Sequence, residues 1–177
     1  MRRFFLFAFL LVGAVGLRAG GWVLDSSTLT YRVTHRLHKV EGTSHGARGK
    51  GLCDGSGCRF LVAAPVNTFD SGDSNRDLHM IETTRGAQFP MVKVSVNLAA
   101  VPAGEAFTAD LSIEFAGKSH RYASVPFRVA DRSAGLRFTG QIPLRLTDFS
   151  VPAPSLLGMA VKDDVPVDVE MSWSQKP

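Results

Sequence analysis

Apolar and polar residues alternate along most of the chain, a pattern typical of strands with one buried face and one solvated face. The runs expected to form strands are residues 22–37, 59–67, 92–98, 107–115, 123–129, 136–146 and 165–173. A Gly-rich run at 41–51 fits a strand with bulges, because glycine allows the sharp coiling of a small barrel. In the run 123–129 the pattern places Ala123, Val125, Phe127 and Val129 on the inner face.

Residues 70–90 form the one long segment after the first strand that does not alternate. Asp73 or Ser74 can cap a helix there, and Gly86 supplies a stop. The segment therefore predicts a short helix from about Asn75 to Arg85. Because a helix this short is marginal alone in water, we expect it to dock on another element and to close one end of a β-structure.

About eight strands at short spacing, with one helix and no βαβ rhythm, predict an all-β protein with an antiparallel sheet. Such a sheet can cover its apolar face only by folding over into a sandwich or by closing into a barrel. At about eight strands, a closed barrel has an interior that is either filled by side chains or able to hold one ligand. The length of 177 residues fits a single domain.

The first 19 residues have the three parts of a secretory signal peptide: Met1-Arg-Arg, an apolar stretch over 4–17, and small residues near Ala19. We expect cleavage after Ala19, which leaves residues 20–177 as an exported, periplasmic domain. The short, strongly apolar leader favours the general export route over the twin-arginine route that Arg2-Arg3 suggests. No transmembrane anchor is expected after the leader is removed.

The net charge of the chain without its leader bears on whether it binds nucleic acid. The full chain has 20 basic and 16 acidic residues, a net charge of +4. Loss of Arg2, Arg3 and Arg18 lowers the net charge to +1. A surface so balanced offers no field for nucleic acid, so we expect no nucleic-acid partner.

Both cysteines lie in the run Cys53-Asp-Gly-Ser-Gly-Cys58. In an oxidising compartment this run predicts a disulfide across a tight hairpin, since Asp-Gly and Ser-Gly are turn pairs. The rival interpretation, a redox or zinc pair, lacks the two-residue spacing and a second pair of ligands. His35 and His38 point to opposite sides of one strand and cannot jointly hold a metal, so no metal site is expected.

Several motifs resemble those of the YceI-like family over residues 22–173. They are Tyr31-x-Val33-x-His35, Asp70-Ser-Gly followed by Arg76-Asp77-x-His79-Met80, Phe89-Pro90-x-Val92, and the closing Asp164-Val-Pro-Val-Asp-Val169. The resemblance implies an exported, lipocalin-like antiparallel barrel that binds polyisoprenoid lipids.

Candidate ligand-binding residues fall into two groups. At the mouth of the barrel we expect a polar collar of Arg76, Asp77 and His79, with Leu78 and Ile81 as an apolar lid. For the interior the candidates are Tyr31, Val33, His35, Phe60, Val62, Phe138, Ile142 and Phe149. Alternatives stay open, because Asp77 could merely serve the helix start and Arg76 could pair with an acid such as Asp70 or Asp73. His35 could be a hydrogen-bonded core histidine, and the interior residues could simply fill a core.

The chain carries none of the common catalytic signatures, neither a Gly-x-Ser-x-Gly elbow nor His-Glu-x-x-His, so an enzyme is not expected. The favoured function is binding, transport or storage of a long-chain isoprenoid lipid, a polyprenyl or quinone-like amphiphile, with no other cofactor. The alternative is a packed barrel that works through its surface as an accessory or stress-related interaction module. The oligomeric state, monomer or homodimer, is left open.

Overall fold

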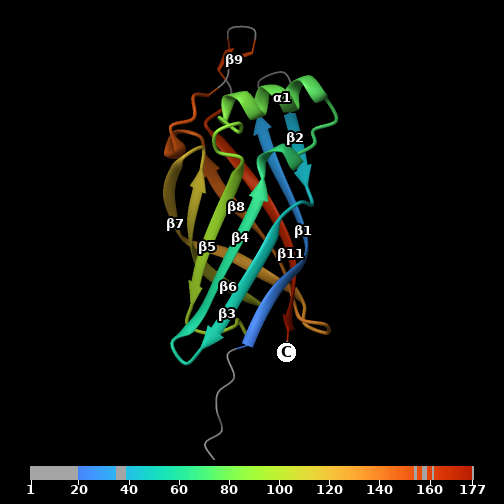
Figure 1. Ribbon diagram of the computed structural model, residues 1–177, viewed down its shortest axis with the longest axis vertical. Helices are drawn as coiled ribbons and strands as arrows, with labels where there is room; N and C mark the ends of the chain where they lie inside the picture. The colour runs from blue at the N-terminus through green and yellow to red at the C-terminus, as the bar shows by residue number, and fades with distance from the viewer. Residues whose placement is uncertain (1–19, 35–38, 154, 157–158, 161, 177) are drawn as a thin grey trace, which may run out of the picture.

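The computed structural model describes residues 20–34, 39–153, 155–156, 159–160 and 162–176, and its strands form an elongated antiparallel barrel (Figure 1). The strands are β1 (Gly20–Thr34), β2 (Lys39–Ser44), β3 (Arg48–Asp54), β4 (Gly57–Pro65), β5 (Met91–Leu98), β6 (Ala106–Phe115), β7 (Lys118–Asp131), β8 (Leu136–Arg145), β9 (Ser155–Leu156), β10 (Met159–Ala160) and β11 (Asp164–Lys176). The helices are α1 (Ser74–Thr83) and two short 3₁₀ turns, η1 (Val66–Thr68) and η2 (Thr147–Phe149).

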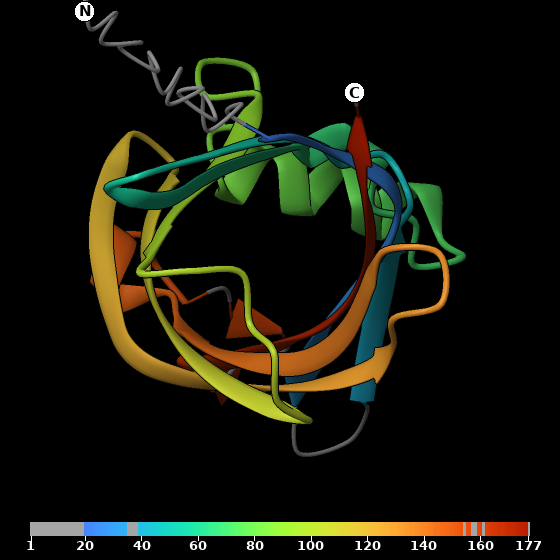
Figure 2. The ribbon, with the colours of Figure 1, turned by 90° about the horizontal axis from the view of Figure 1, so that it is seen from below.

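The main sheet has nine strands in the order β11-β8-β7-β6-β5-β4-β3-β1-β2, and β11 also pairs with β1. That pairing closes a ring of eight strands, and β2 extends the sheet beside the far half of β1. The view along the barrel shows the closed ring, with α1 at the far end (Figure 2). Closure confirms the predicted antiparallel barrel of about eight strands with one short helix.

β1 is long enough to have two partners on one edge. Its first residues pair with β3 from Gly20↔Cys53 to Val23↔Lys50, and its last residues pair with β2. The expected single strand over 41–51 is therefore wrong, since it is divided between β2 and β3. At the break, a Cβ on Gly46 would lie 2.8 Å from Thr68 Cγ2, so η1 packs against the backbone where the strand is interrupted.

β7 contains a bulge that the alternating pattern did not predict. The pairing shifts from Ala109↔Val125 to Leu111↔Tyr122, so two residues of β7 oppose Asp110. Ser124 has a φ of 54° and donates its N–H to Asp110 Oδ1 at 2.7 Å. The expected inward position of Ala123 is wrong: Ala123 is exposed and Tyr122 is buried in its place.

Helix α1 crosses one end of the barrel, opposite the C-terminus (Figure 1). Asp73 is its N-cap, and its carboxylate accepts hydrogen bonds from the N–H groups of Asn75 (3.0 Å) and Arg76 (3.1 Å). The helix ends two residues earlier than expected, because Arg85 takes a left-handed φ of 56° and its side chain turns to donate to the Ala116 carbonyl. Within the described residues, no helix is long and apolar enough to cross a membrane.

The disulfide between Cys53 and Cys58 joins β3 to β4 across their hairpin, which confirms the predicted pairing. The two residues are direct partners in the ladder, with their Cα atoms 4.0 Å apart. The hairpin lies at the end of the barrel opposite α1 (Figure 1).

Candidate functional site

The barrel encloses a cavity of about 670 Å³, within the usual size range of small-molecule sites. Its wall is formed by the inward side chains of β1, β2, β4, β5, β6, β7, β8 and β11. β3 contributes none, because its inward positions are Gly49, Gly51 and the disulfide-bonded Cys53. A Cβ at Gly49 would lie 2.5 Å from Trp173, and one at Gly51 would collide with the ring of Phe60. The glycines thus let two large aromatic rings lie directly on the β3 backbone.

The cavity is elongated along the barrel. On β8 alone it is lined from Leu136 to Leu144, which at about 3.3 Å per residue spans roughly 26 Å of strand. At one end the wall includes Arg76 and His79 of α1, and at the other it includes Pro102 of the β5–β6 loop. The space therefore runs from the helix toward the opposite end of the barrel.

Most of the wall is apolar, with an aromatic cluster of Phe107, Phe127 and Phe138. The rings of Phe107 and Phe127 are stacked with centroids 5.2 Å apart, and Phe138 meets them edge-on at 5.5 and 5.4 Å. Such clusters bury large apolar area and hold their rings in fixed positions. This part of the wall favours apolar ligand groups.

Polar groups gather at the helix end of the cavity. The α1 region contributes Asp73, Asn75, Arg76, His79, Met80, Thr83 and Thr84 to the wall. Arg76, Met80 and Thr83 are spaced four and three residues apart, so they share one face of the helix. The Nδ1 atom of His79 also lies 3.8 Å from Oε2 of Glu82, on the exposed side of the helix.

Ser71 determines how α1 is rotated. Its N–H and hydroxyl donate to Asp77 Oδ1 at 3.1 and 2.5 Å, and its Oγ and carbonyl accept from the Arg76 guanidinium at 2.9 and 2.8 Å. These bonds tie the first turn of α1 to the preceding loop. Asp77 is thus held at the helix start by Ser71, as one of the alternatives above has it, whereas Arg76 is bound to Ser71 and also reaches the cavity.

The rotation of α1 corrects the expected lid. Leu78 is 58% exposed and Ile81 packs beside Gly86, and neither lines the cavity. The apolar residue that α1 turns inward is Met80. The error arose because helical spacing identifies residues that share a face but does not say which face the tertiary contacts turn inward.

Tyr31 is a polar group in the wall near α1. Its ring lies over Gly42 and 5.7 Å from the ring of Phe69. Burial, followed by the negative charge of Asp77, raises the pKa of the Tyr31 phenol above its ordinary value of 10. The phenol is therefore protonated at neutral pH and can donate a hydrogen bond.

The structure places the other sequence-predicted residues as follows. The cavity wall includes Tyr31, Val33, Phe60, Val62, Arg76, His79, Phe138 and Ile142, whereas Asp77, Leu78, Ile81 and Phe149 lie outside it. Phe149 is fully buried behind the wall, with its ring 5.5 Å from that of Phe115. His35 lies outside the described residues. Contact of any of these residues with a ligand stays a prediction.

Many wall residues were not among the predicted candidates. They include Val92, Val94, Val96 and Leu98 on β5, Phe107 on β6, Phe127 on β7, and Val165, Val167, Val169, Met171 and Trp173 on β11. The signal that could have found them is the alternation itself, because closure turns every inward face toward one cavity. Among the described residues, no group of three or more His, Cys, Asp or Glu side chains is placed to hold a metal ion.

A family model described as the YceI-like domain matches residues 22–173, nearly the whole described barrel. The chain belongs to the YceI-like family. A search of curated protein sequences found no match.

Solved structures of three other bacterial proteins have the same fold. Burkholderia cenocepacia BcnA is 18% identical with a TM-score of 0.67, over 84% of this chain and 96% of BcnA. A polyisoprenoid binding domain from Saccharophagus degradans, implicated in plant cell wall breakdown, is 19% identical with a TM-score of 0.64, over 88% and 98%. The Campylobacter jejuni YceI protein is 13% identical with a TM-score of 0.65, over 81% and 89%. At these identities the comparison shows the shared barrel fold.

Proposed function

We propose that this YceI-like protein binds one long-chain lipid of the isoprenoid type, a polyprenyl or quinone-like amphiphile, inside its barrel, and carries or stores it. The observation that supports this most is the elongated apolar cavity of about 670 Å³ with polar groups at one end. The structurally similar Saccharophagus degradans protein, described as a polyisoprenoid binding domain, supports the same ligand class.

The apolar wall accounts for affinity. Each buried CH₂ group contributes about 0.8 kcal/mol, so about ten of them reach the ~8 kcal/mol of micromolar binding before ordering costs are subtracted. The roughly 26 Å of lined strand on β8 gives room for a chain of that length. Affinity would then come from the tail of the lipid.

The polar end accounts for orientation. Tyr31, Arg76 and His79 lie in the wall near α1, whereas Leu98, Leu136 and the ring of Phe107 line other parts of it. A lipid head group would therefore lie at the α1 end, where the Tyr31 phenol and the Arg76 guanidinium can donate hydrogen bonds. The tail would run toward Pro102.

Compartment and mode of action belong to the same proposal. The leader-like first 19 residues and the Cys53–Cys58 disulfide support export to an oxidising periplasm. The alternative, a packed barrel that acts only through its surface, is less consistent with an interior that leaves about 670 Å³ unfilled. A binding role without catalysis is the simplest use of such a cavity.

The test is to produce the full chain with its leader, purify it from the periplasm of a bacterial host, extract it with organic solvent and identify lipids by mass spectrometry. We expect about one long-chain lipid per protein, or uptake of one equivalent of an added long polyprenol. If the protein holds no stoichiometric lipid and takes up no added polyprenol, the proposal is wrong.

A matched pair of variants on β6 tests where the lipid lies. Ala109 is buried in the cavity wall, and its neighbour Thr108 is exposed on the outer surface. Ala109→Trp should fill the cavity and reduce lipid recovery at least tenfold, whereas Thr108→Trp should leave recovery unchanged. Val96→Phe on β5 provides a second, smaller obstruction in case Ala109→Trp fails to fold. Equal recovery from all three variants would place the lipid outside the barrel.

A further inference from the structure

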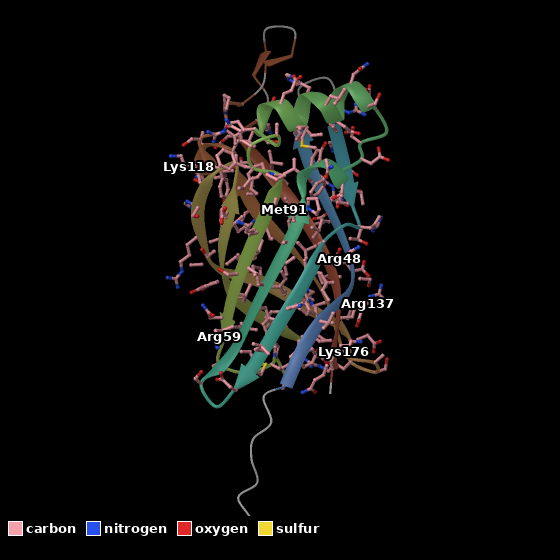
Figure 3. All side chains as sticks on the ribbon, in the orientation of Figure 1. Arg48, Arg59, Met91, Lys118, Arg137 and Lys176 are labelled. Carbon is pink, nitrogen blue, oxygen red and sulfur yellow. A yellow bond between two sulfur atoms is a disulfide. The ribbon has the colours of Figure 1, made fainter. Side chains whose placement is uncertain are left out.

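The outer surface of β3, β4 and β5 differs from the rest of the barrel wall. These strands lie nearest the viewer in Figure 3, where Arg48, Arg59 and Met91 are labelled on them. We call this surface the β3–β5 face and define it by the outward side chains Arg48, Lys50, Leu52, Arg59, Leu61, Ala63, Met91, Lys93, Ser95 and Asn97.

Two leucines lie exposed on the β3–β5 face. Leu52 is 56% exposed and Leu61 is 53% exposed, and among the described residues only Leu78 is a comparably exposed large apolar side chain. In the ladder Leu61 is the partner of Lys50, and Leu52 is the partner of Arg59. Each leucine is thus flanked by the aliphatic stem of a cation. A surface groove of about 340 Å³ runs between these four side chains and β5.

The same face carries four cations, Arg48, Lys50, Arg59 and Lys93, and the one carboxylate on its three strands is Asp54, at the hairpin end of β3. Arg59 and Lys93 have acidic neighbours only at the edges: Asp54 at 3.7 Å on the hairpin and Glu114 at 3.2 Å on β6. Among the described residues no carboxylate lies within 4.0 Å of the charged groups of Arg48 or Lys50.

The surface of β8 and β11 gives the contrasting case. There Arg137 pairs with Glu170, and Arg145 pairs with Asp163 at 3.3 Å. On β1, Arg32 pairs with both Glu41 and Asp168. Cations on these strands are therefore neutralised locally, whereas Arg48 and Lys50 on the β3–β5 face have no such partner within the described part of the chain.

We propose that the β3–β5 face docks the barrel on the surface of an anionic lipid bilayer. Exposed leucines flanked by cations fit the boundary between acyl chains and negatively charged head groups. Leu52 and Leu61 would enter this boundary, while Lys50 and Arg59 would lie among the phosphates. A second copy of the chain is a poor partner for this face, because packing two β3–β5 faces together would place their cations against each other.

This docking goes beyond ligand binding in the cavity and does not depend on it. The face lies on the outside of the wall, and its charged and leucine side chains do not line the cavity. A barrel with a blocked cavity should therefore still dock. Failure of docking and failure of lipid binding can be told apart in the same preparation.

The test is sedimentation of the purified protein with vesicles, comparing phosphatidylcholine alone with a mixture of phosphatidylcholine and phosphatidylglycerol. We expect binding to the mixed vesicles and at least tenfold weaker binding to phosphatidylcholine alone or at high salt. Lys50→Glu should weaken binding more than fivefold, because one cation near an anionic surface contributes about that factor. The double variant Leu52→Ser/Leu61→Ser should weaken binding to the mixed vesicles more than Lys50→Glu does.

Matched controls come from residues of the same types elsewhere. Leu78→Ser changes an equally exposed leucine on α1, and Lys118→Glu reverses an exposed cation at the start of β7. Both should bind mixed vesicles as the wild type does, and so should Ala109→Trp. The proposal is overturned if the wild type does not bind anionic vesicles, even if it binds an acidic protein or forms dimers instead. It is also overturned if the control variants lose as much binding as the β3–β5 variants.

Discussion

Tyr122 shows how one residue connects three segments at the α1 end of the barrel. It is 9% exposed on β7, donates a hydrogen bond to Asp148 Oδ2 at 2.7 Å, and accepts one from the Arg145 N–H at 3.2 Å. The ring of His120 lies 4.8 Å away. The bulge at Ser124 brings this phenol inside, so a local irregularity of β7 supports the junction of β8 with η2.

Removing the Tyr122 hydroxyl should destabilise the protein without changing its shape. Tyr122→Phe leaves the Arg145 N–H without its partner in a part-buried place, which costs about 1–3 kcal/mol in the free energy of unfolding. Urea denaturation measures this change. The control is Tyr31→Phe, at the only other tyrosine, whose hydroxyl lies at the cavity and should cost less. A larger loss for Tyr31→Phe would contradict this account.

Tyr122 also predicts a pH dependence. Burial, and then the hydrogen bond to Asp148 and its negative charge, raise the pKa of the phenol well above its ordinary value of 10. The unfolded chain therefore loses this proton near pH 10 while the folded protein keeps it, so the free energy of unfolding should fall as pH rises above about 10. Urea denaturation from pH 8 to 11 should show this fall, with a shallower slope in Tyr122→Phe. An unchanged slope would assign the effect to other groups.

At the scale of elements, the β3–β4 hairpin and α1 cap the two ends of the barrel in different ways. The hairpin is fixed covalently by Cys53–Cys58, and α1 is fixed by hydrogen bonds through Ser71 and Asp73. The hairpin also carries Leu52 of the β3–β5 face. The hairpin therefore serves stability, and α1 shapes the polar end of the cavity.

Loss of the disulfide should lower stability modestly. Closing a six-residue loop contributes about 2 kcal/mol on the chain-entropy model. Cys53→Ser/Cys58→Ser should thus unfold at a lower urea concentration, with its free energy of unfolding reduced by about that amount. Lipid recovery should stay near that of the wild type, because neither cysteine lines the cavity. The oxidised wild type and its reduced form provide the matched comparison. A loss of lipid binding would mean that the hairpin shapes the cavity.

Two truncations on α1 test its rotation. Met80 lines the cavity, whereas Leu78 is exposed. Met80→Ala should speed lipid release about fivefold, which corresponds to the loss of about 1 kcal/mol of apolar contact. Leu78→Ala should not change release. Stopped-flow transfer of a fluorescent polyprenol to vesicles measures both rates, and the opposite order would mean that α1 turns its other face to the ligand.

At the scale of the whole molecule, the pairing of β1 with β11 turns separate apolar faces into one interior. The register runs from Gly21↔Lys176 to Tyr31↔Val167, interrupted by a bulge between Leu24 and Ser26. Closure removes the free edges that β1 and β11 would present in an open sheet, and β2 remains as a short edge strand beside β1. Closure also makes the cavity a property of nearly the whole ring, since seven of its eight strands, all except β3, contribute to the wall together with β2.

A ligand held by the whole ring should stabilise the whole fold. At a free lipid concentration of 100 times Kd, binding to the folded state adds about 2.7 kcal/mol. For a chain of this size that corresponds to a rise in Tm of about 5–10 °C. Differential scanning fluorimetry with an added long polyprenol should show this rise in the wild type and none in Ala109→Trp. A rise of equal size in both would indicate binding outside the cavity.

Local order could be predicted well from the sequence. The alternation on 165–173 gave the inward set from Val165 to Trp173, and all five of these residues line the cavity. The turn pairs between Cys53 and Cys58 predicted the disulfide, and Asp73 was one of two expected caps. These features depend on neighbours a few residues away, so short-range chemistry decides them.

Tertiary structure decided what depends on distant partners. The rotation of α1 follows from Ser71, the inward position of Tyr122 from a bulge opposite Asp110, and the split of 41–51 from η1 packing at Gly46. The β3–β5 face exists only because strand pairing places Leu52 beside Arg59 and Leu61 beside Lys50. Alternation specified which residues point inward, but only closure of the ring, with Gly49 and Gly51 admitting two aromatic rings, determined that the interior keeps an open cavity.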